Sequence, residues 1–260
     1  MDRATLLKAF EANLWDRTAF LAKEREGAEI VDTSDLLMVD SGLPCRELNI
    51  IGRCTLHPRF AIDRIEAPVQ RFRDKAFPFS WILGPLSGHG LLEPALKGLK
   101  LTCAEEEWIM GLPLDTGSVP GTSLAGFDIQ RVATSEGVED YAALMATTKD
   151  GIDENIKTFY ADAKEIIMGP SPLRHYLGYV GAEPVAALEA FNAHGVFSFH
   201  AMATQVATRG KGYGPALLIH ALREAKKAGL RMACVQTPEA GRALYERVGF
   251  KPAGRIATYT

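Results

Sequence analysis

The sequence Arg-Gly-Lys-Gly-Tyr-Gly-Pro at residues 209–215 decides how the fold of this 260-residue chain is interpreted. Its closely spaced glycines let the backbone turn sharply and approach a ligand, because no Cβ atom stands in the way. An apolar helical stripe follows, formed by Gly214, Leu217, Leu218, Ala221, Leu222 and Ala225. The turn therefore opens a helix, and its N–H groups converge at the positive end of that helix, where a phosphate is favoured.

Two common phosphate-binding loops fit this stretch poorly. A nucleoside-triphosphate loop needs Ser or Thr after Gly-Lys to hold magnesium, whereas Gly212 follows Lys211 here. A dinucleotide-binding turn needs GxGxxG after an early strand of a parallel sheet, with an acidic residue about 20 positions further on. The glycine spacing here is GxGxG, and it stands late in the chain.

The turn instead resembles the signature of the GCN5-related N-acetyltransferase (GNAT) family, Arg/Gln-x-x-Gly-x-Gly/Ala. Arg209, Gly212 and Gly214 fill its fixed places. A second block, Leu-Tyr-Glu-Arg-Val-Gly-Phe at 244–250, is similar to the family's LYExxGF segment and stands at the family's usual separation. The resemblance covers roughly residues 126–260. It implies an α/β fold in which helices flank a mixed, mostly antiparallel sheet.

The resemblance also implies a site for acetyl-CoA, the co-substrate of this family. The diphosphate would lie on the glycine turn, and the pantetheine arm would pair with the end of the family's fourth strand. The cofactor-binding residues expected on this basis are Met202, Ala203, Thr204, Arg209, Gly210, Lys211, Gly212, Tyr213 and Gly214.

The implied chemistry is direct attack of a deprotonated amine on the thioester in a ternary complex. Tyr245 matches the family's general acid, since a phenol of pKa ~10 can share its proton with a leaving thiolate. The base has no fixed position in the family. His200 is one candidate, because it shares alternation parity with Met202 and Thr204 on the expected fourth strand and has a reference pKa of ~6.5. Glu189 on the preceding strand is the other, and a purely structural role stays open for all three candidates.

A stretch rich in Pro, Gly, Ser and Thr interrupts the chain near its middle. We expect domains over residues 1–115 and 126–260, joined by a linker at 116–125. A weak internal repeat relates the two parts, because residues 67–108 and 215–259 both follow the order helix, strand, helix, strand. The chain is therefore expected to be a tandem of two related domains.

The first of these domains has no glycine-rich turn of its own. We expect helices over residues 5–23 and 67–75. The sequence Asp-Arg-Ile-Glu-Ala at 63–67 stands ahead of the second helix, where a working copy would have its turn. We therefore predict a degenerate acetyltransferase-like or accessory domain, which shapes the acceptor cleft or mediates assembly. A homodimer is an assembly that this interpretation allows.

Composition argues against several other classes of protein. The net charge is −3, so the chain lacks the strongly basic surface of a nucleic-acid-binding protein. The four cysteines have no CxxC spacing, which favours reduced thiols in a cytoplasmic protein and predicts no metal cofactor. No apolar run approaches the ~20 residues needed to cross a bilayer, and the N-terminus does not resemble a signal peptide. We expect no membrane partner.

The predicted function is transfer of an acetyl group from acetyl-CoA to a primary amine, most simply a small molecule. Two other classes stay open. A non-catalytic acyl-CoA sensor would bind the cofactor without turnover, and an interaction protein that kept only the fold would not bind it. Gly212 and Gly214 count against the second, since an abandoned loop has no reason to keep them.

Overall fold

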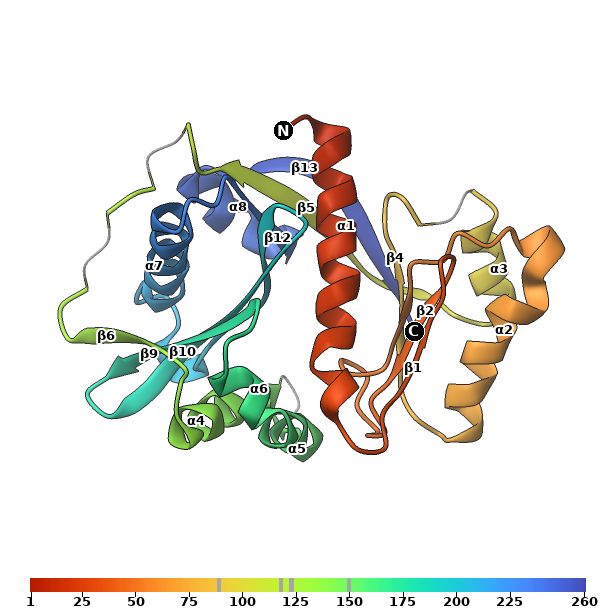
Figure 1. The fold of residues 1–260 in the computed structure, drawn as a ribbon, viewed down its shortest axis with the longest axis horizontal. Helices are drawn as coiled ribbons and strands as arrows, with labels where there is room; N and C mark the ends of the chain where they lie inside the picture. The colour runs from red at the N-terminus through yellow and green to blue at the C-terminus, as the bar shows by residue number, and fades with distance from the viewer. Residues whose placement is uncertain (88–89, 117–118, 122–123, 149–150) are drawn as a thin grey trace.

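The computed structural model describes residues 1–87, 90–116, 119–121, 124–148 and 151–260. Within these residues the strands form an 11-stranded sheet and a separate two-stranded sheet, β7 (Thr147–Thr148) with β8 (Gly151–Ile152). Two neighbouring pairs in the large sheet run parallel and the rest antiparallel, with helices on both faces, which confirms the expected fold class (Figure 1). In spatial order the large sheet contains β1 (Glu29–Asp32), β2 (Leu37–Asp40), β3 (Ile50–Gly52), β4 (Ser80–Leu83), β13 (Lys251–Tyr259), β5 (Cys103–Pro113), β12 (Met232–Pro238), β11 (Val196–Thr204), β10 (Glu183–Ala193), β9 (Leu173–Val180) and β6 (Phe127–Arg131).

The two halves of the chain repeat one order of elements. In the N-terminal half, antiparallel strands β1 to β3 are followed by α2, the parallel strand β4, α3 and β5. In the C-terminal half, antiparallel strands β9 to β11 are followed by α7, the parallel strand β12, α8 and β13. The repeat predicted from the sequence is therefore present. The four helices are α2 (Pro58–Asp74), α3 (Leu92–Gly98), α7 (Tyr213–Lys227) and α8 (Glu239–Val248).

The halves exchange their last strands at the centre of the sheet. Strand β5 pairs with β12 on one side and with β13 on the other, and β13 continues the sheet to β4. The sequence limits 1–115 and 126–260 stay a prediction, because strands on either side of them interleave in space. The expected linker at 116–125 falls between β5 and β6, with residues 117–118 and 122–123 outside the described part.

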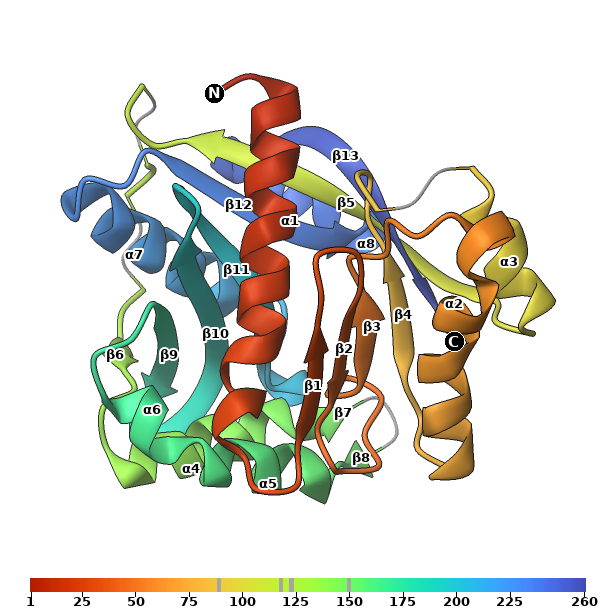
Figure 2. The ribbon, with the colours of Figure 1, turned by 45° about the vertical axis from the view of Figure 1, so that its right-hand side comes forward.

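Helix α1 (Arg3–Phe20) lies between the two halves, and it corresponds to the helix predicted over residues 5–23 (Figures 1 and 2). Its Leu6 and Leu7 touch the backbone of Gly111 in β5 and Gly254 in β13, so close that a Cβ atom on either glycine would clash. Helices α4 (Ser135–Met145), α5 (Glu154–Asp162) and α6 (Lys164–Met168) bury apolar side chains in the same core cluster as α1, whereas α7 and α8 pack in another. None of the described helices is both long and apolar enough to cross a lipid bilayer.

Helix α2 begins earlier than the sequence predicted. It starts at Pro58, with the His57 side chain accepting a hydrogen bond from the Arg59 N–H at 3.2 Å. Residues 63–67 therefore lie inside the helix and not ahead of it. A proline is more typical of the first turn of a helix than of its interior, so local pattern does not indicate that a helix extends back past residue 67. Here Pro68 is instead buried in the interior of a helix that already deviates at Ala61.

Candidate functional site

The glycine turn has backbone N–H groups without a hydrogen-bond partner among the described residues. Gly212, at φ +87°, is the residue that precedes the first turn of α7. Within the described part of the chain, the N–H groups of residues 210–214 donate no hydrogen bond, and the first donor of the helix is Ala216, to the Gly212 carbonyl. Arg209 ties the turn to β11, since its Nε donates to the Thr204 carbonyl at 3.1 Å. These open donors can hold an anion.

Strand β11 has a free backbone edge next to the turn. It pairs with β12 only from Phe197 to Phe199, although β11 runs on to Thr204 and β12 to Pro238. Beyond those pairs the two parallel strands no longer bond to each other. The edge from residue 200 to residue 204 can therefore bond to an extended ligand.

The predicted pantetheine-binding residues lie on this edge, and two of them face α7. A Cβ atom on Gly214 would lie 3.2 Å from Thr204 Oγ1 and 3.8 Å from Met202 Sδ. A larger residue than glycine would thus push the helix away from the strand. Ala203 packs into the core cluster on the opposite face, with α1 and α4.

A β-bulge at His200 overturns the predicted side-chain alternation. Glu189 pairs with Ala201, whereas the next residue, Ala190, pairs with Phe199, so His200 is an extra residue in β11. The insertion moves the His200 side chain to the α1 face together with Ala201, while Met202 faces α7. The prediction that His200 shares a face with Met202 and Thr204 is therefore wrong, because alternation does not continue through a bulge.

The protonation state of His200 follows from its partner Asn13 on α1. His200 Nε2 lies 2.8 Å from Asn13 Oδ1. Asn13 Nδ2 lies within hydrogen-bonding distance of the carbonyls of Phe191, Ala193 and Val196. The amide orientation is thereby fixed, so His200 donates from Nε2 and keeps its lone pair on Nδ1. Burial, together with the nearby Arg17 guanidinium, lowers the pKa of His200 to about 3.

Glu189 is fully buried and its carboxylate is occupied. Arg17 Nε donates to Oε1 at 2.5 Å, Tyr160 donates its hydroxyl to Oε2 at 3.3 Å, and His175 Nε2 lies 3.1 Å from Oε2. Burial disfavours the charged form, but Arg17 and His175 outweigh it and hold the pKa of Glu189 well below its usual range. This arrangement suits an ion pair that fastens α1 to β10 better than a proton acceptor.

Tyr245 lies on α8, which follows directly on β12. It is 6% exposed and packs edge-on against Phe250 at 5.7 Å. Its hydroxyl has no hydrogen-bond partner among the described residues. Burial and the charge of Glu107 raise the pKa of Tyr245 to about 12, so the phenol keeps its proton at neutral pH. A general acid needs that state.

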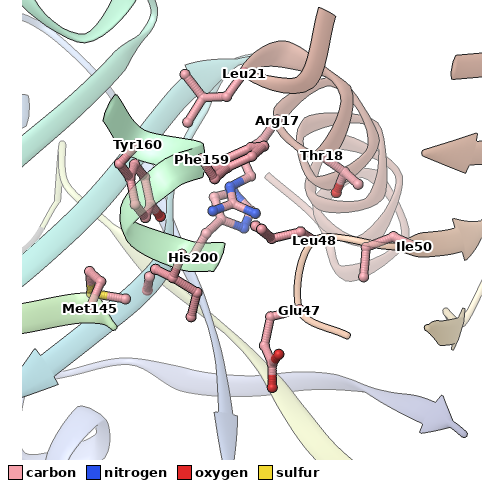
Figure 3. A pocket seen from close by; sticks show the side chains of 12 residues that line it. Arg17, Thr18, Leu21, Glu47, Leu48, Ile50, Met145, Phe159, Tyr160 and His200 are labelled. Carbon is pink, nitrogen blue, oxygen red and sulfur yellow. The ribbon is translucent and has the colours of Figure 1, made fainter. Parts of the chain in front are cut away.

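A pocket of about 270 Å³ opens at the bulge, between the two halves (Figure 3). The N-terminal half supplies one side, from α1 and from the segment between β2 and β3, and α5 and β11 supply the other. Its lining comprises Arg17, Thr18, Leu21, Glu47, Leu48, Ile50, Met145, Ile156, Phe159, Tyr160, His200 and Ala201. Among these residues only His200 was predicted from the sequence, because no local motif indicates that α1 or the β2–β3 segment lies next to β11.

A second cavity of about 190 Å³ lies beside the glycine turn. It is bordered by α4, by Ala203 and Thr204 at the end of β11, and by Arg209 of the turn. The larger pocket contains His200 and Ala201 of the same strand. The two cavities thus occupy successive positions along β11.

The corresponding cleft of the N-terminal half is filled by α1. A Cβ atom on Gly52, at the end of β3, would lie 2.4 Å from the Trp15 ring, and one on Gly84, just after β4, would lie 2.5 Å from the Glu11 carboxylate. Glu11 also accepts hydrogen bonds from the Leu86 N–H at 2.6 Å and the Ser87 hydroxyl at 3.1 Å. The loop that leads into α2, residues 53–57, contains no glycine.

Comparison with known proteins agrees with this architecture. Residues 158–252 match the family model of the acetyltransferase (GNAT) domain. A solved GCN5-related N-acetyltransferase from Kribbella flavida has a similar structure, with a TM-score of 0.70 and 18% identity over 95% of this chain and 94% of that one.

Two further solved structures show the same fold. A GCN5-related N-acetyltransferase from Sphaerobacter thermophilus gives a TM-score of 0.59 at 14% identity, over 88% of this chain and 81% of that one. A tandem GNAT protein from the clavulanic acid biosynthesis pathway gives 0.59 at 13% identity, over 90% and 83%. No curated protein sequence matches the chain significantly. The predicted family resemblance is confirmed, including the GNAT-like character of the N-terminal half.

Proposed function

From the premise that the chain carries a GNAT acetyltransferase domain at residues 158–252 and has the fold of a tandem GNAT protein, we propose that it transfers an acetyl group from acetyl-CoA to a primary amine. The fold supports acyl transfer in general. The observation that carries the specific proposal is the open turn at residues 209–214 beside the free edge of β11.

The residues of the turn fit a diphosphate. Gly210 and Gly212 have φ values of +80° and +87°, and the nearest atom to a Cβ built on Gly212 would be 3.7 Å away. The cradle is therefore shaped by glycine backbone and left open. Arg209 and Lys211 are exposed and add positive charge beside it. Bound acetyl-CoA would supply an activated thioester, and the β11 edge at residues 202–204 would hold its pantetheine arm by backbone hydrogen bonds.

In the proposed reaction, two side chains would move the protons. His200 is neutral with its lone pair on Nδ1 and lines the 270 Å³ pocket. Its low pKa makes it a weak base, so it would take the proton only as the amine attacks the thioester and the attacking nitrogen becomes acidic. Tyr245, protonated at neutral pH, would supply a proton to the leaving thiolate. Glu189 would act only by holding Arg17.

The proposal is tested by two measurements on the full chain. Isothermal titration with acetyl-CoA tests the cofactor site, and release of free thiol from acetyl-CoA in the presence of amines tests transfer. We expect binding and amine-dependent thiol release. Binding without release for any amine would favour a sensor, and absence of binding would overturn the proposal.

A further inference from the structure

We propose that the pocket at the bulge selects a primary amine with an apolar body, of the size of one ring or a short alkyl chain, that carries no carboxylate. This inference rests on the proposed acetyl transfer. It names the class of acceptor, which the fold itself leaves open.

The position of the pocket makes it the acceptor site for that reaction. His200 and Ala201 belong both to the pocket wall and to the strand whose edge continues to the glycine turn. An amine in the pocket and a thioester on the edge would therefore meet at the bulge. His200 Nδ1, the unprotonated ring nitrogen, belongs to a side chain of the same pocket.

Most of the pocket wall is apolar. The apolar and aromatic members are Leu21, Leu48, Ile50, Met145, Ile156, Phe159, Tyr160 and Ala201. Figure 3 shows Phe159 and Tyr160 close to Arg17 and His200, with Leu48 and Ile50 across from them. The volume of about 270 Å³ lies just under the ~300–1,000 Å³ typical of sites for drug-sized ligands. A polar acceptor such as an aminosugar would lose much of its hydration there and would find few polar partners in the wall.

The charges around the pocket favour a cation at the rim and disfavour an anion. Arg17 is neutralised by the buried Glu189 carboxylate at 2.5 Å, so the pair brings no net positive charge to the pocket for a carboxylate to bind. Glu47 lines the pocket and is exposed, and its carboxylate lies within 4.8 Å of the side-chain ligand atoms of Asp153 and Cys45. Burial raises the pKa of the Cys45 thiol, so this thiol stays neutral. Glu47 thus places a carboxylate at the rim of the pocket, with Asp153 from the other half of the chain beside it.

These charges also limit the number of cationic groups on the acceptor. The rim attracts one ammonium group while it is still solvated. A second ammonium group would have to enter the apolar wall, where a charge without a partner is costly. Polyamines are therefore expected to be poor acceptors.

The substrate test compares amines that differ in one feature. We would measure kcat/KM by thiol release for 2-phenylethylamine, for phenylalanine, which adds a carboxylate to the same body, for ethanolamine and for spermidine. We expect 2-phenylethylamine to exceed each of the others by about tenfold or more. For ethanolamine, about tenfold is the ratio that burying one apolar side chain, worth about 1.5 kcal/mol, gives. For phenylalanine and spermidine, the difference comes from the cost of placing an additional charge in the apolar pocket.

The outcomes separate this inference from the proposed function. A higher kcat/KM for phenylalanine, ethanolamine or spermidine would overturn the inference and leave acetyl transfer intact. The inference would also fall if acetyl-CoA bound and none of the four amines were acetylated. Absence of acetyl-CoA binding would overturn the proposed function itself.

A pair of variants tests the location of the pocket. Leu48→Glu places a charge in its wall and should lower kcat/KM for 2-phenylethylamine more than about tenfold, with an unchanged Kd for acetyl-CoA. Val31→Glu adds the same charge on β1, outside the pocket, and should leave both values unchanged. The unchanged Kd shows that Leu48→Glu is folded. Equal kcat/KM in the two variants would overturn the assignment.

A second pair of variants tests the carboxylate at the rim of the pocket. The readouts are KM, kcat and the preference between two amines, which report on the pocket and not on general stability. Glu47→Gln should raise KM for 2-phenylethylamine a few-fold with little change in kcat. It should also lower the ratio of kcat/KM for 2-phenylethylamine to kcat/KM for phenylalanine. Glu66→Gln removes an equally exposed carboxylate on α2 and should change neither value. An unchanged preference in Glu47→Gln would contradict the electrostatic part of the inference.

Discussion

The two halves of this protein have the same order of elements, yet they differ in the loop between the third antiparallel strand and the helix that follows it. In the C-terminal half, the loop into α7 carries glycines whose N–H groups donate no hydrogen bond among the described residues. In the N-terminal half, Trp15 and Glu11 of α1 occupy the ends of β3 and β4. The comparison teaches that the duplicated topology provides a cleft between parallel strands, and that the loop and the packing helix decide whether a ligand can use it.

The largest expected effect comes from making the C-terminal turn unable to bind an anion. Gly212→Asp should weaken acetyl-CoA binding at least about a hundredfold. The left-handed backbone costs a residue with a Cβ atom about 1–2 kcal/mol, and a carboxylate at the helix start would occupy the N–H groups and repel the diphosphate. Isothermal titration measures the loss.

A matched glycine provides the control for this variant. Gly181 also has positive φ, +63°, with nothing within 4 Å of a built Cβ, but it lies in the turn between β9 and β10. Gly181→Asp should cost similar stability and leave acetyl-CoA binding intact. Equal binding in Gly212→Asp and Gly181→Asp would remove the turn from the site.

The next effect compares how α1 is held in each half. Glu189→Gln leaves the Arg17 charge without its buried partner and should lower the free energy of unfolding by about 3–5 kcal/mol. Glu11→Gln should cost only about 1 kcal/mol, since the partners of Glu11 are an N–H and a hydroxyl group and burial raises its pKa. Urea unfolding measures both. Equal losses of unfolding free energy in the two variants would contradict the distinction between the charged partner of Glu189 and the uncharged partners of Glu11.

A smaller effect on catalysis should follow from making α8 resemble α3, which has no tyrosine over residues 92–98. Tyr245→Phe should lower kcat by about a hundredfold, the lower range for loss of a general acid. The Kd for acetyl-CoA should stay within a factor of about two. Tyr179→Phe, which loses the hydrogen bond to Asp140 but lies on β9, serves as control. An unchanged kcat in Tyr245→Phe would exclude the acid role.

The smallest expected effect is on the pH dependence of stability. The pKa of His200 is about 3 in the folded protein and ~6.5 when unfolded, so the unfolded state binds more protons between these values. Stability is therefore full above pH ~6.5 and falls as the pH drops, by at most about 2 kcal/mol between pH 7 and pH 5. Solvent that enters the pocket would reduce this figure.

The test of that pH dependence is a substitution that cannot titrate. His200→Gln should flatten the fall in unfolding free energy between pH 7 and pH 5, measured by urea unfolding at several pH values. His194→Gln, which removes an exposed histidine beside Asp16, should keep the parent slope. If the unfolding free energy of His200→Gln fell with pH as steeply as that of the parent protein, His200 would not be held neutral by the fold.

The elements that were predicted correctly are those that a local sequence pattern determines. The glycine turn and the ends of α7 and α8 depend on backbone conformations that single residues dictate. Gly229 and Gly249, for example, both have the positive φ expected after a helix. Strand β1 was not predicted, because its exposed residues form no apolar alternation. Helix α2 was predicted too short, since a proline such as Pro68 is uncommon in the interior of a helix.

What the sequence by itself determined is the GNAT fold, the order of its elements and the placement of the glycine turn at the start of α7. Only the tertiary structure decided which face His200 occupies, that Arg17 pairs with Glu189, and that the N-terminal half lines the pocket. The physical reason is distance along the chain. Turns and helix ends are fixed by neighbouring residues, whereas a bulge depends on the paired strand and an ion pair between α1 and β10 depends on the whole fold.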